Sequence, residues 1–222
     1  MWNDNIYLAS SSPRRREMFT WIGLSFNNIS ADINEEAWRG ELPIEYVMRL
    51  AREKAHKGKE KVGEKSLVVA ADTIVALDGE MLGKPRDALE AENMLRKLRG
   101  RIHQVITALC VINAEGNTTY QDHCLTRVEM RNYSDEEIRA YIESGDPLDK
   151  AGAYAIQHQS FKPVVNFNGC FASVMGLPLC HLERTFRKID GYPMRDMPAI
   201  CKMNVGYTCP IFPRVLAGEM IG

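Results

Sequence analysis

The sequence of 222 residues lacks an excess of charge of either sign, because 28 lysines and arginines face 29 aspartates and glutamates. This balance argues against a broad surface for nucleic acid or anionic lipid, although clustered charges can still bind an anion locally. Apolar runs approaching the roughly 18 residues of a membrane-spanning helix are also missing. The first residues, Met1–Tyr7, lack the basic and then apolar layout of a secretory signal. We therefore expect a cytoplasmic protein without a nucleic-acid or membrane partner.

Cysteine pairs of the CxxC kind are missing as well, although the chain has six cysteines. At this length, six free thiols in a reducing compartment are more typical than a disulfide framework. A metal site can be drawn from Cys180, His181, Cys201 and Cys209, but their irregular spacing is unlike that of structural zinc motifs. We therefore expect free thiols.

The composition fits one sizeable folded domain, with 45% hydrophobic and 26% charged residues. Strand-like and helix-like segments alternate, and hairpin signals interrupt the alternation, so the pattern predicts an α/β fold with a mixed sheet. Four prolines and few charges set the end of the chain apart. We predict a catalytic domain over residues 1–190 and a proline-rich tail over residues 191–222, which packs along the body or a neighbouring subunit.

The individual elements follow from apolar periodicity and helix caps. Strands are predicted over residues 5–9, 24–29, 66–77, 105–113, 118–130, 153–157 and 161–165. Helices are predicted over residues 13–23, 43–61, 87–100, 134–145 and, as the last one, 179–189.

The strongest local signal is the run Ser10-Ser-Ser-Pro-Arg-Arg-Arg16 between the first strand and the first helix. A helix N-terminus presents free N–H groups, and the hydroxyls and guanidinium groups beside it add donors for an anion such as phosphate. An N-capped helix with solvated arginines explains the same residues, so both interpretations stay open.

Asp72 interrupts the most apolar run of the chain, where an unpaired carboxylate would be costly. We favour a carboxylate that holds a metal or activates water over one that bonds local backbone amides. Lys54 flanks the apolar stripe of its helix, where Arg49 is expected to face solvent. Lys84 lies in a constrained loop, where loop residues often serve binding, and Glu35 lies in an acidic turn and could be a second carboxylate. From these residues alone, solvated side chains are the simpler explanation of both.

The late segment from Gly145 to Gln157 is rich in turn residues and then strand-like. The amide of Gln157 can donate to one atom and accept from another, as reading the edge of a base requires. A surface glutamine is the simpler explanation of the same residue.

Six motifs together carry a family resemblance. They are Ser10-x-Ser-Pro-Arg-Arg15, Arg52-Glu-Lys54, Ala71-Asp-Thr73, Leu82-Gly-Lys-Pro85, Lys150-Ala-Gly-Ala-Tyr-Ala-Ile-Gln157 and Val174-Met-Gly-Leu-Pro178. In this order and spacing the chain resembles the Maf family of nucleoside triphosphate pyrophosphatases over about Ile6 to Arg187. The resemblance implies a fold like that of inosine triphosphate pyrophosphatases, with an elongated mixed sheet flanked by helices and two lobes around a cleft.

The resemblance also implies hydrolysis of a nucleoside triphosphate to the monophosphate and pyrophosphate, with Mg²⁺ or Mn²⁺ as cofactor. It places phosphate contacts on Ser10, Arg14, Arg15, Lys54 and Lys84. It makes Glu35 and Asp72 the metal-associated carboxylates, and Asp72, Lys54 and Lys84 the catalytic set, in which Asp72 accepts the proton.

Within the family, Ala153-Tyr-Ala-Ile-Gln157 resembles the branch that acts on dTTP and UTP. In that branch specificity is associated with the positions of Arg14, Thr73 and Gln157, and Thr73 is expected to orient the amide of Gln157. His158 and the segment Gly169-Cys-Phe-Ala-Ser173 depart from the family pattern and leave the preferred base open.

Other functions remain as alternatives. The chain could be a nucleotide-binding regulator of cell division without turnover, or a pyrophosphatase for CTP, 7-methyl-GTP or a damaged purine nucleotide. A homodimer is a further expectation.

Overall fold

The computed structural model describes residues 5–192 and 194–221. Within them, seven strands form one sheet in the order β2-β1-β3-β5-β6-β7, with β4 paired to β3. β1 runs parallel to β2 and β3, and the other pairs are antiparallel, so the predicted α/β class with a mixed sheet is confirmed. The strands are β1 (Ile6–Ala9), β2 (Asn27–Ile29), β3 (Leu67–Leu77), β4 (Glu80–Leu82), β5 (Ile102–Asn113), β6 (Thr118–Met130) and β7 (Val164–Val165).

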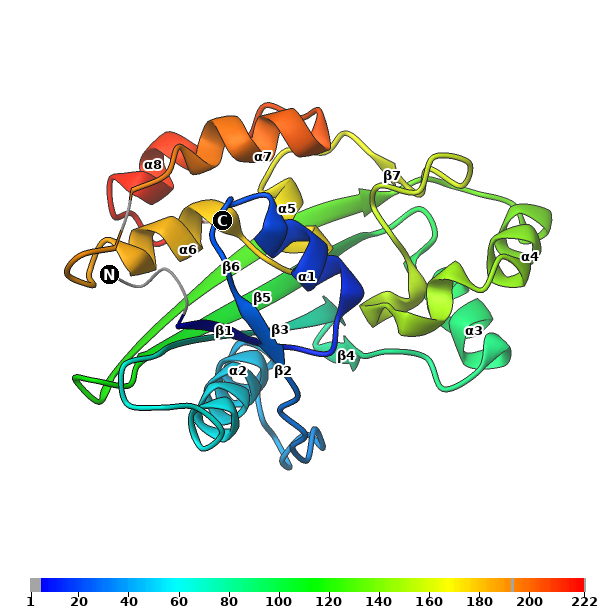
Figure 1. Cartoon of the computed structure of the whole chain (residues 1–222). Coiled ribbons are helices and arrows are strands. Elements are labelled where there is room, and N and C mark those ends of the chain that lie inside the picture. The colour runs from blue at the N-terminus through cyan, green and yellow to red at the C-terminus, as the bar shows by residue number, and fades with distance from the viewer. Residues whose placement is uncertain (1–4, 193, 222) are drawn as a thin grey trace.

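Helices cover both faces of the sheet (Figure 1). One face carries α2 (Pro43–Lys59), and the other carries α1 (Pro13–Thr20), α5 (Phe171–Met175) and α6 (Leu179–Phe186). α7 (Met197–Val205) and α8 (Phe212–Leu216) pack outside α6. In the part of the chain that the structure describes, no helix has the length and apolar character needed to cross a membrane.

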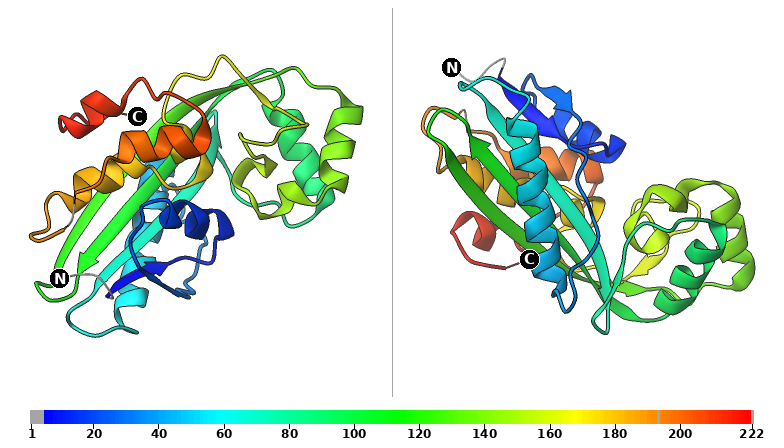
Figure 2. Two further views of the ribbon diagram at one scale, coloured as in Figure 1. Left: turned by 45° about the horizontal axis from the view of Figure 1, so that its top comes forward. Right: turned by 90° about the horizontal axis from the view of Figure 1, so that it is seen from below.

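A second lobe lies at the far end of the long strands, as both views of Figure 2 show. It holds α3 (Ala88–Leu98), α4 (Asp135–Glu143) and two short 3₁₀ helices, η1 (Asp146–Asp149) and η2 (Ala151–Ala153). This lobe has its own hydrophobic core, built around side chains such as Leu95 and Tyr133. The predicted division into two lobes is therefore present.

β3 connects the two lobes. Val69 and Ala71 pack into the core beneath α1 and α6, whereas Val75 and Leu77 on the same side of the strand enter the core of the second lobe. Alternate residues of a strand point to one face, so the change from one core to the other falls at Thr73. The junction of the lobes is thus a point in the middle of a buried strand.

The edge of β3 is open at this junction. β1 pairs with β3 only as far as Leu8 with Val69, and β4 begins to pair at Val75 with Leu82. Among the described residues, no strand pairs with residues 70–74 on this side. The loops that follow β1 and β4 both reach this gap, so side chains distant in sequence can meet there.

Two predicted strands are wrong or too long. Residues 153–157 form the end of η2 and a turn, because Gly152 and Ala153 both adopt positive φ and interrupt an extended chain. Of residues 161–165, only Val164 and Val165 pair with β6.

The helix over residues 179–189 is shorter than predicted and is not the last one. The proline-rich tail forms two further helices, and Pro198 and Pro213 stand in the first turns of α7 and α8, where proline fits a helix well. Asp196 caps α7 by accepting a hydrogen bond from the Ala199 N–H. Both helices pack on α6, so the described part of the tail lies along the body.

Gly152 should be required for docking η2 onto β3. Its φ is +67°, and an added Cβ would lie 2.8 Å from Cγ2 of Val75, whereas Gly145, with a φ of +75°, has no atom within 4 Å of that point. We predict that Gly152→Ala lowers the free energy of unfolding by about 1–3 kcal/mol more than Gly145→Ala, measured by urea denaturation. Val75→Ala should cost less in the Gly152→Ala background than alone, and equal losses in the two glycine variants would contradict the clash.

Candidate active site

A cavity of about 410 Å³ lies at the gap in the edge of β3, between the two lobes. The first lobe contributes the loop after β1, residues 31–35, α2 and β3, and the second lobe contributes the loop after β4 and residues 149–154. Eight of the nine predicted site residues line this cavity: Ser10, Arg14, Arg15, Glu35, Lys54, Asp72, Thr73 and Lys84.

The turn between β1 and α1 forms one wall. Ser12 caps the helix by accepting a hydrogen bond from the Arg15 N–H at 3.4 Å, and Pro13 fills the first turn. The Ser12 N–H in turn donates to Oγ of the buried Ser10 at 3.2 Å. The first turn of α1 holds arginines and no acidic residue. Since positive charge there opposes the helix dipole, this wall suits a bound anion.

Arg14 and Arg15 differ in how they are held. Arg15 donates from Nε to the Gly176 carbonyl and from Nη2 to Oγ1 of Thr73, both at 2.8 Å. Burial lowers the pKa of the Arg15 guanidinium, while the Asp72 carboxylate opposes that shift. Nε of Arg14 is buried and has no hydrogen-bond partner. Arg15 is therefore a fixed charge, and Arg14 retains an unused donor.

Thr73 is part of the support of Arg15. Thr107 Oγ1 donates to the Ser173 carbonyl at 2.8 Å, and it lies 2.9 Å from Oγ1 of Thr73. Because a hydroxyl has one proton, Thr73 donates to Thr107 while it accepts from Arg15. This arrangement differs from the expectation that Thr73 orients the amide of Gln157, since its proton is already used.

Lys54 joins two carboxylates. Its Nζ lies 2.5 Å from Oδ1 of Asp72 and 2.6 Å from Oε1 of Glu35. Burial raises the pKa of the Glu35 carboxyl, but the hydrogen bond and charge of Lys54, with Lys84 and Arg15, bring that pKa below its ordinary value. Asp72 is buried, and its partner is this ammonium group. The three side chains together carry one net negative charge.

Two residues of α2 that sequence reasoning missed hold the Glu35 loop. The Tyr46 hydroxyl donates to the Glu35 carbonyl at 2.8 Å, and burial together with Asp72 and Glu35 raises the pKa of Tyr46 to about 12. Tyr46 precedes Lys54 by eight residues, two helical turns, so its helix spacing is the signal that could have found it.

Arg49 is the second of these residues, and the expectation that it faces solvent is wrong. It is buried, it binds both carboxylate oxygens of Glu41 at 2.6 and 2.8 Å, and it donates to the Glu36 carbonyl at 3.1 Å. Its guanidinium also lies 4.2 Å from the centre of the Trp38 ring. The loop folds back over the helix and covers a side chain that the apolar stripe alone would leave exposed.

The second lobe contributes Lys84 and Tyr154. Lys84 is exposed in the loop after β4, and the neighbouring Gly83 carbonyl accepts a hydrogen bond from the Gly152 N–H at 3.0 Å, which ties this loop to η2. The Tyr154 hydroxyl lies 2.8 Å from Nε2 of His103, and burial lowers the pKa of His103 to about 4. Tyr154 was missed although it belongs to one of the quoted motifs.

Gln157 is the predicted site residue that does not line the cavity. It lies in a turn and is half-buried, and its carbonyl accepts a hydrogen bond from the Gln159 side chain at 3.3 Å. Its Oε1 atom is buried and has no hydrogen-bond partner. The amide therefore still has an acceptor to offer.

Comparison with known proteins assigns the family. The model of the family described as "Maf-like protein" matches residues 5–189. The chain belongs to the Maf family. A dTTP/UTP pyrophosphatase of Geobacter sp. (strain M21) is 44% identical over 189 residues, which are 85% of this chain and 97% of the relative. One of Salmonella typhimurium (strain LT2) is 47% identical over 174 residues, or 78% and 87% of the two chains.

A solved structure, that of a HAM1 protein from Coxiella burnetii, aligns with 60% of this chain and 75% of its own. The TM-score is 0.41 and the sequence identity 18%.

The Arg49 contacts should hold the Glu35 loop closed. We predict that Arg49→Met raises the rate of tryptic cleavage after Arg39, at least about fivefold, because it leaves Glu41 without its partner and opens the loop. Fragment masses over a time course measure this rate. Arg52→Met is the matched control, since Arg52 is exposed on the same helix and makes no hydrogen bond or ion pair within the described residues. Equal cleavage of both variants would show that Arg49 does not hold the loop.

Proposed function

We propose that this Maf-family chain hydrolyses nucleoside triphosphates to the nucleoside monophosphate and pyrophosphate. The observation that carries the proposal is the ion pair of the buried Asp72 with Lys54, completed by Glu35, in the same cavity as the cationic turn of α1. The relatives named dTTP/UTP pyrophosphatases, which match over most of their own length, support the same reaction.

The cationic wall suits the phosphate chain of the substrate. Arg14 offers its unpartnered Nε, and Arg15 supplies a charge held in place by Thr73 and Gly176. Lys84 approaches from the second lobe, on a loop bonded to η2. Positive groups fixed on both lobes stabilise the charge that develops on the departing pyrophosphate, because they need no rearrangement during the reaction.

The two carboxylates fit a divalent cation. Carboxylate oxygens are the ligands that Mg²⁺ and Mn²⁺ prefer, and Asp72 and Glu35 lie close enough to share the single ammonium of Lys54. They are the residues that would hold the ion. When bound there, such an ion would lower the pKa of water and polarise the phosphate.

Asp72 serves as the proton acceptor in this proposal. It is buried at the open edge of β3, with one oxygen bonded to Lys54 and with the cavity before it. A carboxylate in this position takes a proton from the attacking water, and the ammonium of Lys54 holds its orientation. A regulator that only senses nucleotide would need the arginines but would have no use for this costly buried carboxylate.

UTP and dTTP are the proposed substrates. Uracil and thymine place a carbonyl beside an N–H, and the amide of Gln157 complements both groups. The unpartnered Oε1 of Gln157 supports this role, although the residue lies outside the lining of the cavity. We propose that the activity is cytoplasmic, and a homodimer stays a prediction that light scattering can test.

The first test concerns Asp72. We predict that Asp72→Asn lowers turnover of UTP at least about a hundredfold, because the amide keeps the shape but neither accepts the proton nor holds a cation. Pyrophosphate release with Mg²⁺ measures the rate, and removal of the metal with a chelator should abolish it. Asp32→Asn is the control, since it removes a negative charge from the same cavity wall. Comparable activity in both variants would remove Asp72 from the catalytic role.

The second test concerns the base. Across a panel of nucleoside triphosphates, kcat/KM should be highest for UTP and dTTP, lower for CTP and lowest for the purines. Gln157→Glu should lower kcat/KM for UTP about tenfold through the lost donor and the added charge. A panel led by GTP or 7-methyl-GTP would overturn the base assignment and leave the pyrophosphatase reaction in place.

A further inference from the structure

A cluster of metal-binding side chains lies inside the first lobe, apart from the candidate active site. It consists of Cys124 on β6, Cys170 immediately before α5 and His181 on α6. The two sulfur atoms and a ring nitrogen lie within 4.8 Å of one another, and all three residues are buried. None of them has a role in the proposed hydrolysis.

His181 carries an unused lone pair. Its Nε2 lies 2.9 Å from the Ile221 carbonyl, which can only accept, so Nε2 bears the proton and donates. Nδ1 then carries the lone pair, and this buried atom forms no hydrogen bond of good geometry, although the thiol of Cys124 lies against the ring. A buried acceptor without a partner is costly. A ring that donates to a backbone carbonyl through one nitrogen while the other stays free has the arrangement typical of a metal-ligating histidine.

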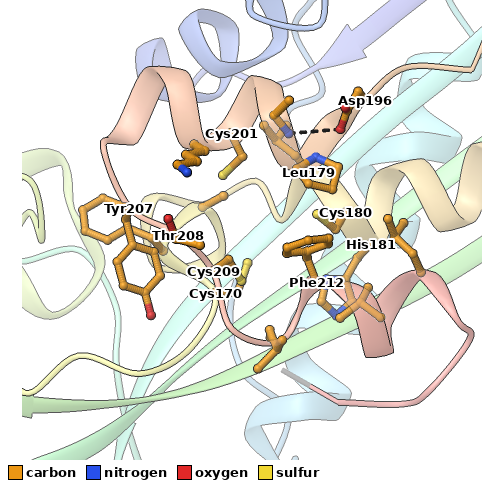
Figure 3. A pocket seen from close by; sticks show the side chains of 18 of the residues that line it. Cys170, Leu179, Cys180, His181, Asp196, Cys201, Tyr207, Thr208, Cys209 and Phe212 are labelled. Atoms are coloured by element: carbon orange, nitrogen blue, oxygen red, sulfur yellow. Dashed lines mark hydrogen bonds between the residues drawn. The ribbon is translucent and has the colours of Figure 1, made fainter.

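The tail supplies a fourth candidate ligand, Cys209. Its thiol contacts the thiol of Cys170 and lies 3.5 Å from the Gly169 carbonyl. Figure 3 shows the side chains of Cys170 and Cys209 side by side, with His181 on the neighbouring helix.

We propose that Cys124, Cys170, His181 and Cys209 bind a structural Zn²⁺ ion that fastens the C-terminal tail to the Maf domain. Three thiolates and one imidazole are a common ligand set of structural zinc. With Zn–S bonds of about 2.3 Å, the sulfurs of a tetrahedral site lie about 3.8 Å apart. Cys124, Cys170 and His181 approach this spacing, and Cys209 would move toward them from its place beside Cys170. The set differs from that drawn from the sequence: Cys124, Cys170 and His181 form the cluster, and Cys209 is added because its side chain lies beside Cys170 in Figure 3, whereas Cys180 and Cys201 are left out.

The proposed ion would help to hold the tail on the first lobe. A cavity of about 620 Å³ separates parts of α6 from α7 and α8. Polar links connect the tail to α6 beside it: Arg184 donates to the carbonyls of Val215 and Glu219, and His181 donates to that of Ile221. Met197 and Val215 of the tail also pack into the core of the first lobe, and a metal bridge would add a fixed link to these contacts.

Metal content tests the site directly. The full-length chain, expressed with zinc and dialysed against a weak chelator, should retain about one zinc ion per chain. Elemental mass spectrometry measures the bound zinc. Cys209→Ser and Cys124→Ser should lose that zinc. Cys180→Ser and Cys201→Ser are matched controls, because both thiols line the same cavity without joining the cluster, and both variants should keep it. Asp72→Asn should also keep it, which separates this ion from the one at the active site.

Cobalt substitution and proteolysis test the metal site further, and the intact mass tests for a disulfide in its place. Cobalt(II) in place of zinc should give the intense sulfur-to-metal absorption of a tetrahedral thiolate site, and Cys209→Ser should weaken it. Stripping the zinc should also speed proteolysis of the tail. Substoichiometric zinc in the folded full-length chain, or an intact mass lower by two hydrogens that marks a disulfide, would overturn the proposal. Cys209 is only half-buried, so its serine variant tests the site even if the variants of the buried ligands fail to fold.

Discussion

The ion pair between Lys54 and Asp72 is the interaction on which the rest of the site depends. A carboxylate in the middle of a buried strand is tolerated because α2 brings an ammonium group within 2.5 Å of it. The same ammonium reaches Glu35, whose loop is held on α2 by Tyr46 and Arg49. The packing of α2 on β3 therefore sets the distance between the two carboxylates, and with it the place for a divalent cation.

The gap along β3 gives this charged group its access to substrate. Because β1 ends early and β4 begins late, a central strand of the sheet has an open edge over residues 70–74. The change of core at Thr73 divides the molecule into lobes at the same point. Arg15, bonded to Thr73 and Gly176, connects α1 with the segment that follows α5. A cavity between two packed cores thus receives charges from both sides.

Most of the strands and helices, and most of the site residues, could be predicted from the sequence. Local signals determine the elements: the apolar run of β3, the hairpin of β5 and β6, and the helix predicted over residues 134–145, found as α4, all occur as expected. The motif order indicated the family, and eight of the nine residues chosen from it meet in one cavity. These features depend on residues close in sequence, or on Asp72, whose charge within an apolar run is unfavourable unless it has a partner or a function.

Tertiary contacts decided the rest. The helix pattern predicts a solvated Arg49, but the loop that carries Glu41 folds over it and binds it. The role of Thr73 depends on its hydrogen bonds with Arg15 and Thr107, which come from other elements. The cysteines show the same limit. Cys124, Cys170 and Cys209 come from a strand, a loop and the tail, so no spacing along the chain relates them. The sequence determines which groups are available, but their meeting depends on long-range packing, because a ligand set or an ion pair is defined by distances in space.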